Sequence, residues 1–456
     1  MIDKVFLLNS STAKKLYRFA KNLPIIDYHN HLSLNEIKTN KRFTDVYELW
    51  VEADPYKHRA MRMCGVSERY ITGDASHEEK FVKWCEVIPL LIGNPLYFWS
   101  LMELKTIFGV SQLPDRENAL DIYRLCNKYL ADNIITVNKM LDDFNVELAC
   151  PCVSITDDIS FLENSSRFSP SLRADDMLNP TKDFIKKLEK CSQTSIKDLK
   201  AFKCAISKRL DYFQEHGCVF ADHAIDNGFR FFDDDGLNDQ RFVSLMENGL
   251  DKENKEKFSI HILLYLGQEY AKRRFVMQLH IGAERYTSTS LRNMVGPAGG
   301  FAGIGNSVDI CSLVKLLDTL DFSENGLPKT VLFTLNPADN ASMSVLSGSF
   351  SKDGVNGLIT QGPAWWWCDH KTGIEEMLEA TAAYSVLSNF IGMTTDSRSF
   401  LSFVRHDYFR RILCNWLGDK VKKSELPCYE KQLKNLIMNL CYGNAKAEVK
   451  SRRLLK

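Results

Sequence analysis

A short stretch near the start of the chain, Ile25-Ile26-Asp27-Tyr28-His29-Asn30-His31, gives the first indication of the fold. Its apolar start predicts a buried strand, and because side chains on a strand repeat every second residue, His29 and His31 should leave on the same side. Two neutral imidazole nitrogens suit zinc or a similar divalent ion, but a metal site needs at least one further ligand. The alternative is two surface histidines that lie close together by chance.

The composition is that of a large chain without a charge bias. It has 456 residues, 45% of them hydrophobic, and 58 basic residues balance 58 acidic ones. This length corresponds to roughly three domains, although one α/β barrel with an insertion also fits. A formal charge of zero argues against nucleic acid or a membrane surface as the partner.

The lack of a recognisable targeting signal and the spacing of the cysteines predict a cytoplasmic enzyme. Residues 1–15 contain no long apolar run, which argues against a signal peptide, and no window reaches the ~18 apolar residues of a membrane span. The thirteen cysteines are scattered, and Cys150 and Cys152 lack the two-pair spacing of a zinc ribbon. Reduced thiols are the simpler interpretation.

Strand-like and helical segments alternate through most of the chain. With the first strand, seven later apolar runs make eight β-then-α units, the number in a closed parallel barrel. We therefore expect an α/β fold, a (β/α)8 TIM barrel with a helical lobe inserted between the first and second strands. The N-terminal helix and first strand would occupy 1–33, the lobe 34–141 and the remaining barrel 142–456. The later strands are predicted at 147–153, 168–172, 218–222, 275–280, 330–335, 357–361 and 389–394, with helices at 196–214, 257–273, 308–320, 375–387 and 410–417.

Polar residues follow the predicted strand ends, where functional residues of such barrels lie. A merely solvated rim would instead show scattered Lys, Glu and Gly. The residues at these ends are His29, His31, Thr156-Asp157-Asp158, Arg173, Asp222-His223, His280, Asn336, Trp365-Trp366, Asp396 and Arg398.

Asp396 is the predicted third metal ligand. It follows the last predicted strand, and the first and last strands of a closed barrel are neighbours, so its carboxylate can face His29 and His31. The alternative role is a helix cap for the segment that follows it. His280 could be a fourth ligand, a hydrogen-bond donor to substrate, or a histidine that only supports the ligands.

Arg173 and Arg398 each follow a predicted strand end. A guanidinium offers a planar fork that matches a carboxylate better than an ammonium does. Structural salt bridges are the alternative for each arginine. Both beside a metal on one rim indicate an anionic substrate.

These residues belong to longer motifs that resemble the uronate isomerase (glucuronate isomerase) family of the amidohydrolase superfamily. The resemblance runs through almost the whole chain and is far more specific than the two histidines alone. Its motifs are Asp27-Tyr28-His29-x-His31-Leu32, Arg59-Ala60-Met61-Arg62, Ile71-Thr72-Gly73-Asp74-Ala75, Asn94-Pro95-Leu96-Tyr97, Thr156-Asp157-Asp158, Asp222-His223, His280-Ile281-Gly282-Ala283, Leu335-Asn336-Pro337, Trp365-Trp366, Thr395-Asp396-Ser397-Arg398-Ser399-Phe400-Leu401-Ser402, Arg405-His406 and Tyr408-Phe409-Arg410-Arg411-Ile412-Leu413-Cys414.

The resemblance implies conversion of D-glucuronate to D-fructuronate, or of D-galacturonate to D-tagaturonate. By matching position it implies a divalent metal, commonly zinc, on His29, His31 and Asp396. It further implies that Arg173 and Arg398 hold the sugar acid, with His280 and Trp366 also at the substrate, and that Tyr56 reaches in from the helical lobe. The expected partner is thus a small sugar acid, and we also expect a homo-oligomer.

Aldose–ketose isomerisation through an enediol needs a base, an acid and a group that stabilises charge on oxygen. We expect Asp396 to be the base at C2 and Tyr56 the acid at the C1 oxygen, while the reverse assignment stays open. A metal-dependent hydrolase and a non-catalytic sugar-acid-binding relative are the alternative functions.

Three departures from the family pattern concern histidines. Pro55, Phe98 and Leu101 stand where the family usually has His, which removes three imidazoles. The metal ligands and both arginines are kept, so the departures bear on the substrate or the rate rather than on the fold.

Overall fold

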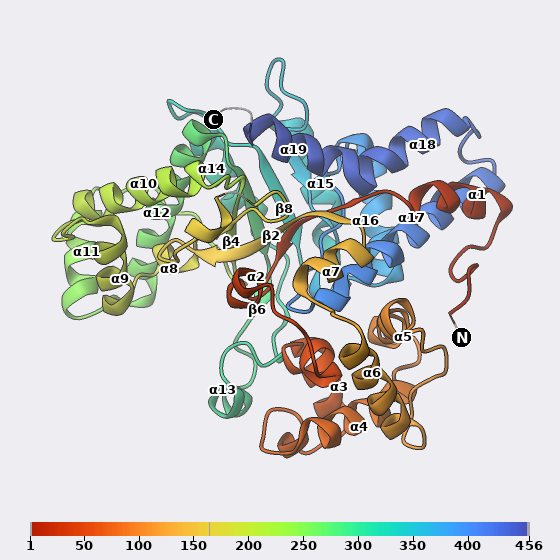
Figure 1. The fold of residues 1–456 in the computed structure, drawn as a ribbon. Helices are drawn as coiled ribbons and strands as arrows, with labels where there is room; N and C mark the ends of the chain where they lie inside the picture. Colours follow the sequence, from red (N-terminus) through yellow and green to blue (C-terminus); the bar gives the residue numbers. More distant parts are fainter. Residues whose placement is uncertain (1, 164, 454–456) are drawn as a thin grey trace.

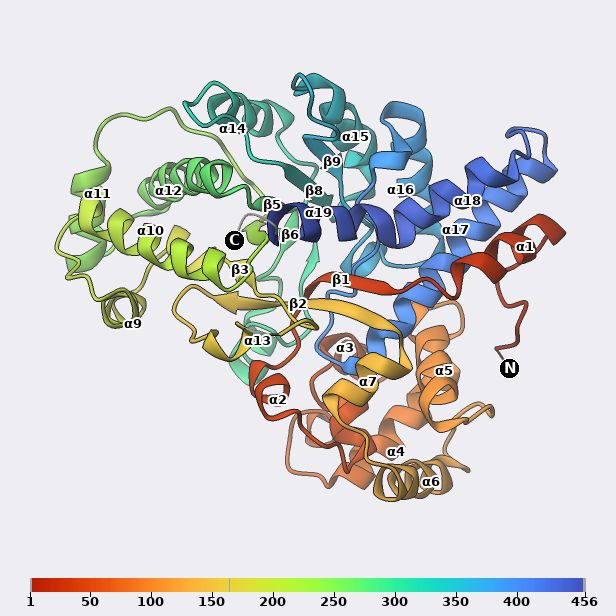
Figure 2. The same cartoon turned by 45° about the horizontal axis from the view of Figure 1, so that its top comes forward.

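The computed structural model describes residues 2–163 and 165–453, and its centre is a curled parallel sheet (Figure 1; Figure 2). Among the described residues this sheet has seven strands in the order β1-β2-β3-β4-β5-β8-β9. Its strands β1, β5 and β8 are buried along their whole length, as expected for parallel strands covered by helices. The strands are β1 (Ile25–Asn30), β2 (Val146–Ser154), β3 (Ser171–Arg173), β4 (Phe220–Ile225), β5 (Val276–Ile281), β8 (Thr330–Thr334) and β9 (Ile359–Gln361).

The register of the strands brings polar side chains together at one edge. Ala224 of β4 pairs with His280 of β5, and His280 pairs in turn with Phe333 of β8. Because all these strands run in the same direction, their carboxyl ends meet at the same edge. His29 and Arg173 lie at that edge as well, at the ends of β1 and β3.

The predicted eighth strand at 389–394 is wrong. Leu387–Asn389 forms a 3₁₀ turn, and Gly392 has a φ of 109°, which interrupts the extended backbone. The segment still lies against β1, because the Tyr28 hydroxyl donates to the Gly392 carbonyl oxygen at 2.9 Å. The N–H of Asp396 donates to the His29 carbonyl oxygen at 3.1 Å. These bonds bring residue 396 to the first strand without a continuous ladder.

The predicted helices form, with some of their ends shifted from the predicted positions. The helix α12 begins at Lys252, earlier than predicted, because the Asp251 side chain accepts the N–H of Asn254 at 2.9 Å. None of the described helices is both long and apolar enough to span a membrane. Outside residues 34–141 the helices are α1 (Ser11–Ala20), α8 (Asp175–Leu178), α9 (Lys182–Ser192), α10 (Leu199–Glu215), α11 (Asn238–Glu247), α12 (Lys252–Arg273), α13 (Thr289–Val295), α14 (Ile310–Asp321), α15 (Asn340–Ser349), α16 (Lys371–Tyr384), α17 (Val404–Lys422), α18 (Glu430–Met438) and α19 (Asn444–Arg453).

Between β1 and β2 the chain is mainly helical, and Figure 1 shows α3 to α6 together at the bottom of the view. The start of α3 is fixed by Asp54, whose carboxylate accepts the N–H of Tyr56 at 2.9 Å. Lys57 is buried with it, 3.1 Å from Asp54 and 3.2 Å from Glu103. This buried ion-pair network fixes the position of Tyr56. The helices here are α2 (Leu34–Thr39), α3 (Pro55–Met63), α4 (His77–Val87), α5 (Pro95–Phe108), α6 (Ala119–Asp132) and α7 (Val137–Asp143).

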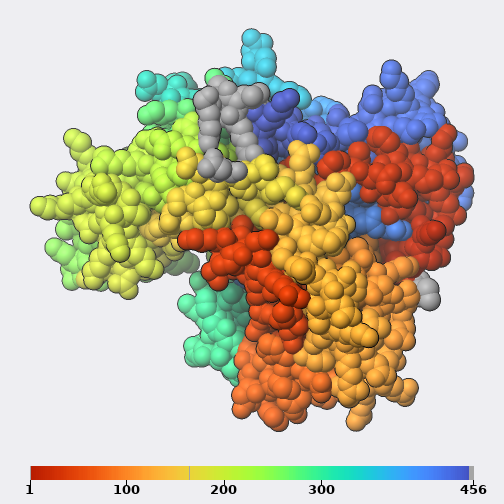
Figure 3. Space-filling view, viewed as in Figure 1, coloured from red at the N-terminus to blue at the C-terminus, as the bar shows by residue number. Residues whose placement is uncertain are grey.

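A hairpin that follows β5 packs against α3. Its short strands β6 (Ala283–Glu284) and β7 (Gly303–Ile304) are antiparallel and enclose α13. Arg59 of α3 donates to the carbonyl oxygens of Gly300 and Ala302 at 3.1 and 3.2 Å. Figure 3 shows this teal segment directly beside the red and orange helices of the N-terminal half.

Candidate active site

Three predicted metal ligands meet at the carboxyl end of β1. The Oδ1 atom of Asp396 lies 3.3 Å from Nε2 of His29 and 3.0 Å from Nε2 of His31. The His29 side chain is 3% exposed, that of Asp396 8% and that of His31 20%. The three side chains therefore form one cluster, partly open on the side of His31.

Asp27 holds the Asp396 segment against β1. Its carboxylate is fully buried and accepts the N–H and the hydroxyl of Thr395, each at 2.7 Å, and the hydroxyl of Thr394 at 3.0 Å. It also lies 3.2 Å from Nε2 of His406. Asp396 has a φ of 47°, a left-handed conformation that is uncommon for a residue with a side chain. Such strain persists only where neighbouring bonds enforce it, and those to Asp27 do so here.

The cluster has the donor chemistry of a divalent metal site. Two ligand atoms bound at about 2.0–2.1 Å to a tetrahedral zinc lie about 3.3 Å apart, close to the separations of Asp396 from His29 and from His31. Two imidazole nitrogens and one carboxylate oxygen suit zinc and similar ions, and three protein ligands leave a coordination position open for substrate. The donor set therefore fits a catalytic cation.

Asp396 is the anionic member of the cluster. Burial raises the pKa of this carboxyl, but hydrogen bonds from His29 and His31 outweigh burial and hold the pKa well below its usual range. Burial lowers the pKa of His31 below the usual value, whereas Cys152 and Asp222 raise that of His29 well above it despite burial. Asp396 therefore stays ionised at neutral pH.

Further donors lie on the other side of His29. The Cys152 sulfur is 3.3 Å from Nδ1 of His29, and together with His31 they form a group with metal-ligand spacing. Asp222 and His280 form a second such group with His29, and Nδ1 of His280 lies 2.5 Å from Asp222. The sequence placed Asp222 at a strand end, but it did not indicate its contact with His280 or that of Cys152 with His29.

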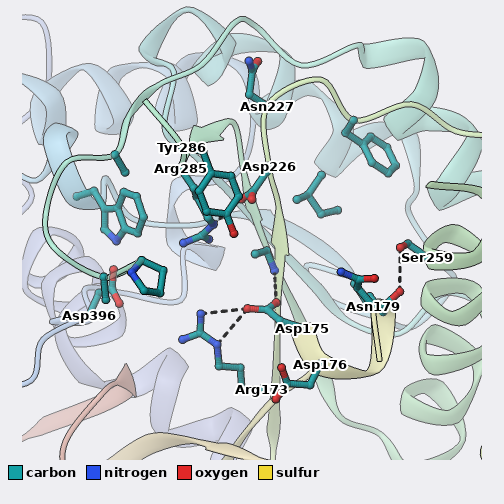
Figure 4. Close-up of a pocket in the computed structure, with 18 of the residues that line it drawn as sticks. Arg173, Asp175, Asp176, Asn179, Asp226, Asn227, Ser259, Arg285, Tyr286 and Asp396 are labelled. Atoms are coloured by element: carbon teal, nitrogen blue, oxygen red, sulfur yellow. Dashed lines mark hydrogen bonds and ion pairs between the residues drawn. The ribbon is translucent and has the colours of Figure 1, made fainter. Parts of the chain in front are cut away.

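A cavity of about 990 Å³ opens over the cluster (Figure 4). Of the predicted site residues, six line it, namely His31, Tyr56, Arg173, Trp366, Asp396 and Arg398. His29 and His280 are not among the described residues that line the cavity. The His280 ring lies between those of Phe333 and His29, with ring centroids 4.2 and 4.6 Å away. The structure thus brings most of the predicted residues around one cavity, with His280 placed beside His29.

Arg173 and Arg285 are the ion-paired arginines of this cavity. Arg173 donates to Asp175 at 3.0 Å and lies 3.5 Å from Nδ1 of His31. Arg285 donates to Asp226 at 2.6 Å and lies over the Trp366 ring. The sequence indicated Arg173 but not Arg285, which comes from the hairpin. The signal overlooked was the Glu-Arg that directly follows the His280-Ile281-Gly282-Ala283 motif.

Tyr56 enters the cavity from α3. Burial, with the nearby Asp396 carboxylate, raises its pKa well above the usual value, while Arg405 opposes this effect. The Arg405 guanidinium lies 5.2 Å from the centre of the Tyr56 ring and 4.0 Å from that of Trp99. The phenol of Tyr56 therefore keeps its proton at neutral pH.

The three departures from the family histidines are not equivalent. Pro55 lines the cavity as the first residue of α3. Phe98 stacks on Tyr408, and Leu101 is buried in the core. Neither is part of the described lining, so only Pro55 changes the cavity wall directly.

Comparisons with known proteins agree with this geometry. The family model described as glucuronate isomerase matches residues 1–448. The uronate isomerase of Clostridium perfringens is 39% identical over 457 residues, covering 97% of this chain and 98% of that protein. That of Haemophilus influenzae is also 39% identical, with 98% of each chain covered.

Solved structures share the fold over nearly the whole chain. The uronate isomerase of Thermotoga maritima superposes with a TM-score of 0.91 at 29% identity, covering 98% of this chain and 99% of that one. The glucuronate isomerase of Caulobacter crescentus also has a TM-score of 0.91, and its 22% identity supports the shared fold alone. The chain belongs to the uronate isomerase family.

Proposed function

We propose that this protein interconverts an aldose uronate and its ketose, D-glucuronate with D-fructuronate or D-galacturonate with D-tagaturonate. The observation that supports this most is the meeting of His29, His31 and Asp396 beside a cavity that also contains Arg173 and Arg398. Family membership gives the reaction, and the local chemistry is consistent with it. A hydrolase or a non-catalytic binder has no comparable support.

His29, His31 and Asp396 would hold one divalent cation, and we propose zinc. When bound, the cation supplies positive charge close to the substrate oxygens. The donor separations support this assignment. Cys152 and Asp222 would keep His29 oriented from its other side.

We assign the base at C2 to Asp396 and the acid at the C1 oxygen to Tyr56. A carboxyl with a lowered pKa is ionised and ready to accept a proton, while a phenol with a raised pKa keeps a proton to donate. The reverse assignment would require a tyrosinate next to the Asp396 carboxylate, and charge repulsion disfavours it.

Arg173 and Arg398 would bind the substrate carboxylate and hydroxyls, which places C1 and C2 between the two proton carriers. Trp366 would form the cavity wall beside the sugar. His280 lies next to His29. It would donate a hydrogen bond to the substrate or serve as a further metal ligand.

We propose four larger-scale features as well. Residues 389–397 would complete a closed (β/α)8 barrel against β1, and 34–141 would form a helical lobe between barrel segments 1–33 and 142–456. The backbone bond from Asp396 to His29 supports closure. Cysteines scattered without a disulfide framework are consistent with the reducing cytoplasm, and a homo-oligomer is the proposed assembly.

A coupled assay of ketose formation from glucuronate and galacturonate tests the function. We expect turnover of at least one uronate, loss of turnover after chelation, and recovery when zinc is added back. Metal-loaded protein that forms no ketose from either uronate would contradict the proposal. Hydrolysis of a lactone or amide instead would favour the hydrolase.

A further inference from the structure

We propose that the cavity binds a second uronate residue covalently joined to the one that reacts, so that the enzyme isomerises the reducing end of short oligouronides. This inference rests on the proposed function and extends its substrate class. It concerns the part of the cavity that lies away from His31 and Asp396.

The cavity is larger than one hexuronate requires. Its volume of about 990 Å³ lies at the top of the range of roughly 300–1,000 Å³ that is typical of pockets for drug-sized ligands. A single hexuronate has only six carbons. In Figure 4, Asp396 lies at one side of the cavity and Asn179 and Ser259 at the other, with Arg173 and Asp175 between them. Space for a second sugar thus remains beyond the reacting one.

The far wall has the surface that a sugar ring needs. Lys255, Ser259 and Leu263 follow one another at intervals of four residues on α12, so they share one face of the helix and line the cavity. Ser259 donates to the Leu178 carbonyl oxygen at 2.9 Å and keeps its acceptor positions for a ligand. Asn179 adds an amide. An apolar floor with a few fixed polar groups is typical of small-molecule sites.

The cavity lining contains both cations and carboxyl groups that a diuronide could use. Within the described part of the chain, neither Arg398 near the cluster nor Lys255 on the far wall makes an ion pair, so each is available to a carboxylate. The lining also contains Asp176 and Asp226, whose pKa values burial raises. Carboxyl groups there can bond the hydroxyls of a sugar. The lining thus offers cations for two carboxylates and carboxyl groups for the sugar hydroxyls.

The chemistry permits this substrate. Isomerisation moves a proton from C2 to C1 and a hydrogen from the C2 oxygen to the C1 oxygen, and no other bond changes. A second uronate joined through the oxygen on C4 leaves C1 and C2 free. The glycosidic bond stays intact, and no co-reactant is needed.

Kinetics with galacturonate and α-1,4-digalacturonate on the metal-loaded enzyme test the inference. We expect ketose formation at the reducing end of the dimer, with a KM at or below that for the monomer. Turnover of galacturonate without turnover or competitive inhibition by the dimer would overturn the inference and leave the isomerase function intact. Failure with both substrates and with glucuronate would contradict the isomerase function itself.

Substitution of Lys255 locates the second uronate. Loss of one charge-assisted hydrogen bond, worth about 1.5–3 kcal/mol, should raise KM for the dimer about tenfold or more in Lys255→Gln and leave the monomer unaffected. Lys272→Gln is the matched control, an exposed lysine on the same helix outside the cavity lining. Equal KM changes for monomer and dimer in Lys255→Gln, or no change for either, would overturn this placement.

Discussion

Asp396 joins the histidine cluster to the cavity, and its substitution is the most direct residue-level test. Asp396→Asn keeps the shape but removes the carboxylate that we propose as base, so kcat should fall by at least about 10²- to 10⁴-fold. Metal content of the variant, measured in parallel, separates loss of the base from loss of the ion. Near-normal turnover of glucuronate by the variant would reject the role of Asp396.

Asp369 gives a prediction about stability and pH. It is 4% exposed, and burial raises its pKa to about 7, with Arg405 opposing and Asp396 adding to the shift. Between pH 4 and 7 the unfolded chain ionises this carboxyl while the folded protein does not. The folded state therefore loses stability as pH rises through this window, by on the order of 4 kcal/mol, and the loss is complete above pH 7.

Asp369→Asn cannot ionise, so it should lack this loss. Relative to the wild type, its free energy of unfolding should increase between pH 4 and 8, as measured by urea denaturation. Asp353→Asn, at an exposed position, is the control and should follow the wild type. A pH-independent difference between Asp369→Asn and the wild type would show that Asp369 ionises freely in the folded protein.

At the residue level, the meeting of the predicted metal ligands could be predicted from their positions along the chain. His29 and His31 follow from alternation on a strand, and Asp396 from the adjacency of the first and last barrel segments. Asp27 and Cys152 could not be assigned in this way, because their roles depend on contacts with residues far away in the sequence. Their partners become visible only once the chain is folded.

The position of the hairpin between β6 and β7 depends on one glycine. Gly300 has a φ of 82°, and a Cβ there would lie 2.3 Å from the Pro55 carbonyl oxygen, at the start of the helix that carries Tyr56. Gly300→Ala should therefore push the hairpin from α3, displace Arg285 and Tyr56, and lower kcat/KM. A steady-state assay with glucuronate measures the change.

Gly296→Ala is the matched control within the same hairpin. Gly296 also has a positive φ, 77°, but a Cβ there meets no atom within 4 Å. Both alanine variants carry backbone strain on the order of 1–3 kcal/mol, so both should have a lower Tm. Only Gly300→Ala should lose activity beyond its loss of folded protein. An equal loss of activity in both would mean that the contact with Pro55 does not position the site.

Helices and strands could be predicted from the periodicity of apolar residues. The prediction was wrong where the backbone conformation of a single residue overrides that pattern. Apolar runs located the strands that became β2, β4, β5, β8 and β9 to within a few residues. The run at 389–394 has the same pattern, but the positive φ of Gly392 prevents a strand, and side-chain bonds from Tyr28 and Thr394 replace the ladder. A glycine that requires such a φ cannot be told from an ordinary strand glycine by sequence pattern alone.

At the scale of the whole molecule, the proposed cation would join the two ends of the fold. It would tie His29 and His31, near the N-terminus, to Asp396, and thereby close most of the chain into one loop. Cross-links that close long loops restrict the unfolded ensemble strongly, and a ligand present at 1,000 times its Kd adds about 4 kcal/mol of stability. Removal of the metal should therefore lower Tm by several degrees as well as abolish turnover.

Thermal unfolding of chelated and zinc-reloaded protein measures this effect, and zinc should restore both Tm and turnover. His31→Ala is the matched variant, because it removes one donor at the open side of the cluster while His29 and Asp396 keep their contact. Its Tm should respond much less to zinc, since two donors bind a cation far more weakly than three. A Tm that rises equally with zinc in the wild type and in His31→Ala would place the stabilising ion elsewhere in the molecule. The residues of the cavity beside His31 would then have to isomerise the sugar acid without a cation bound to His29, His31 and Asp396.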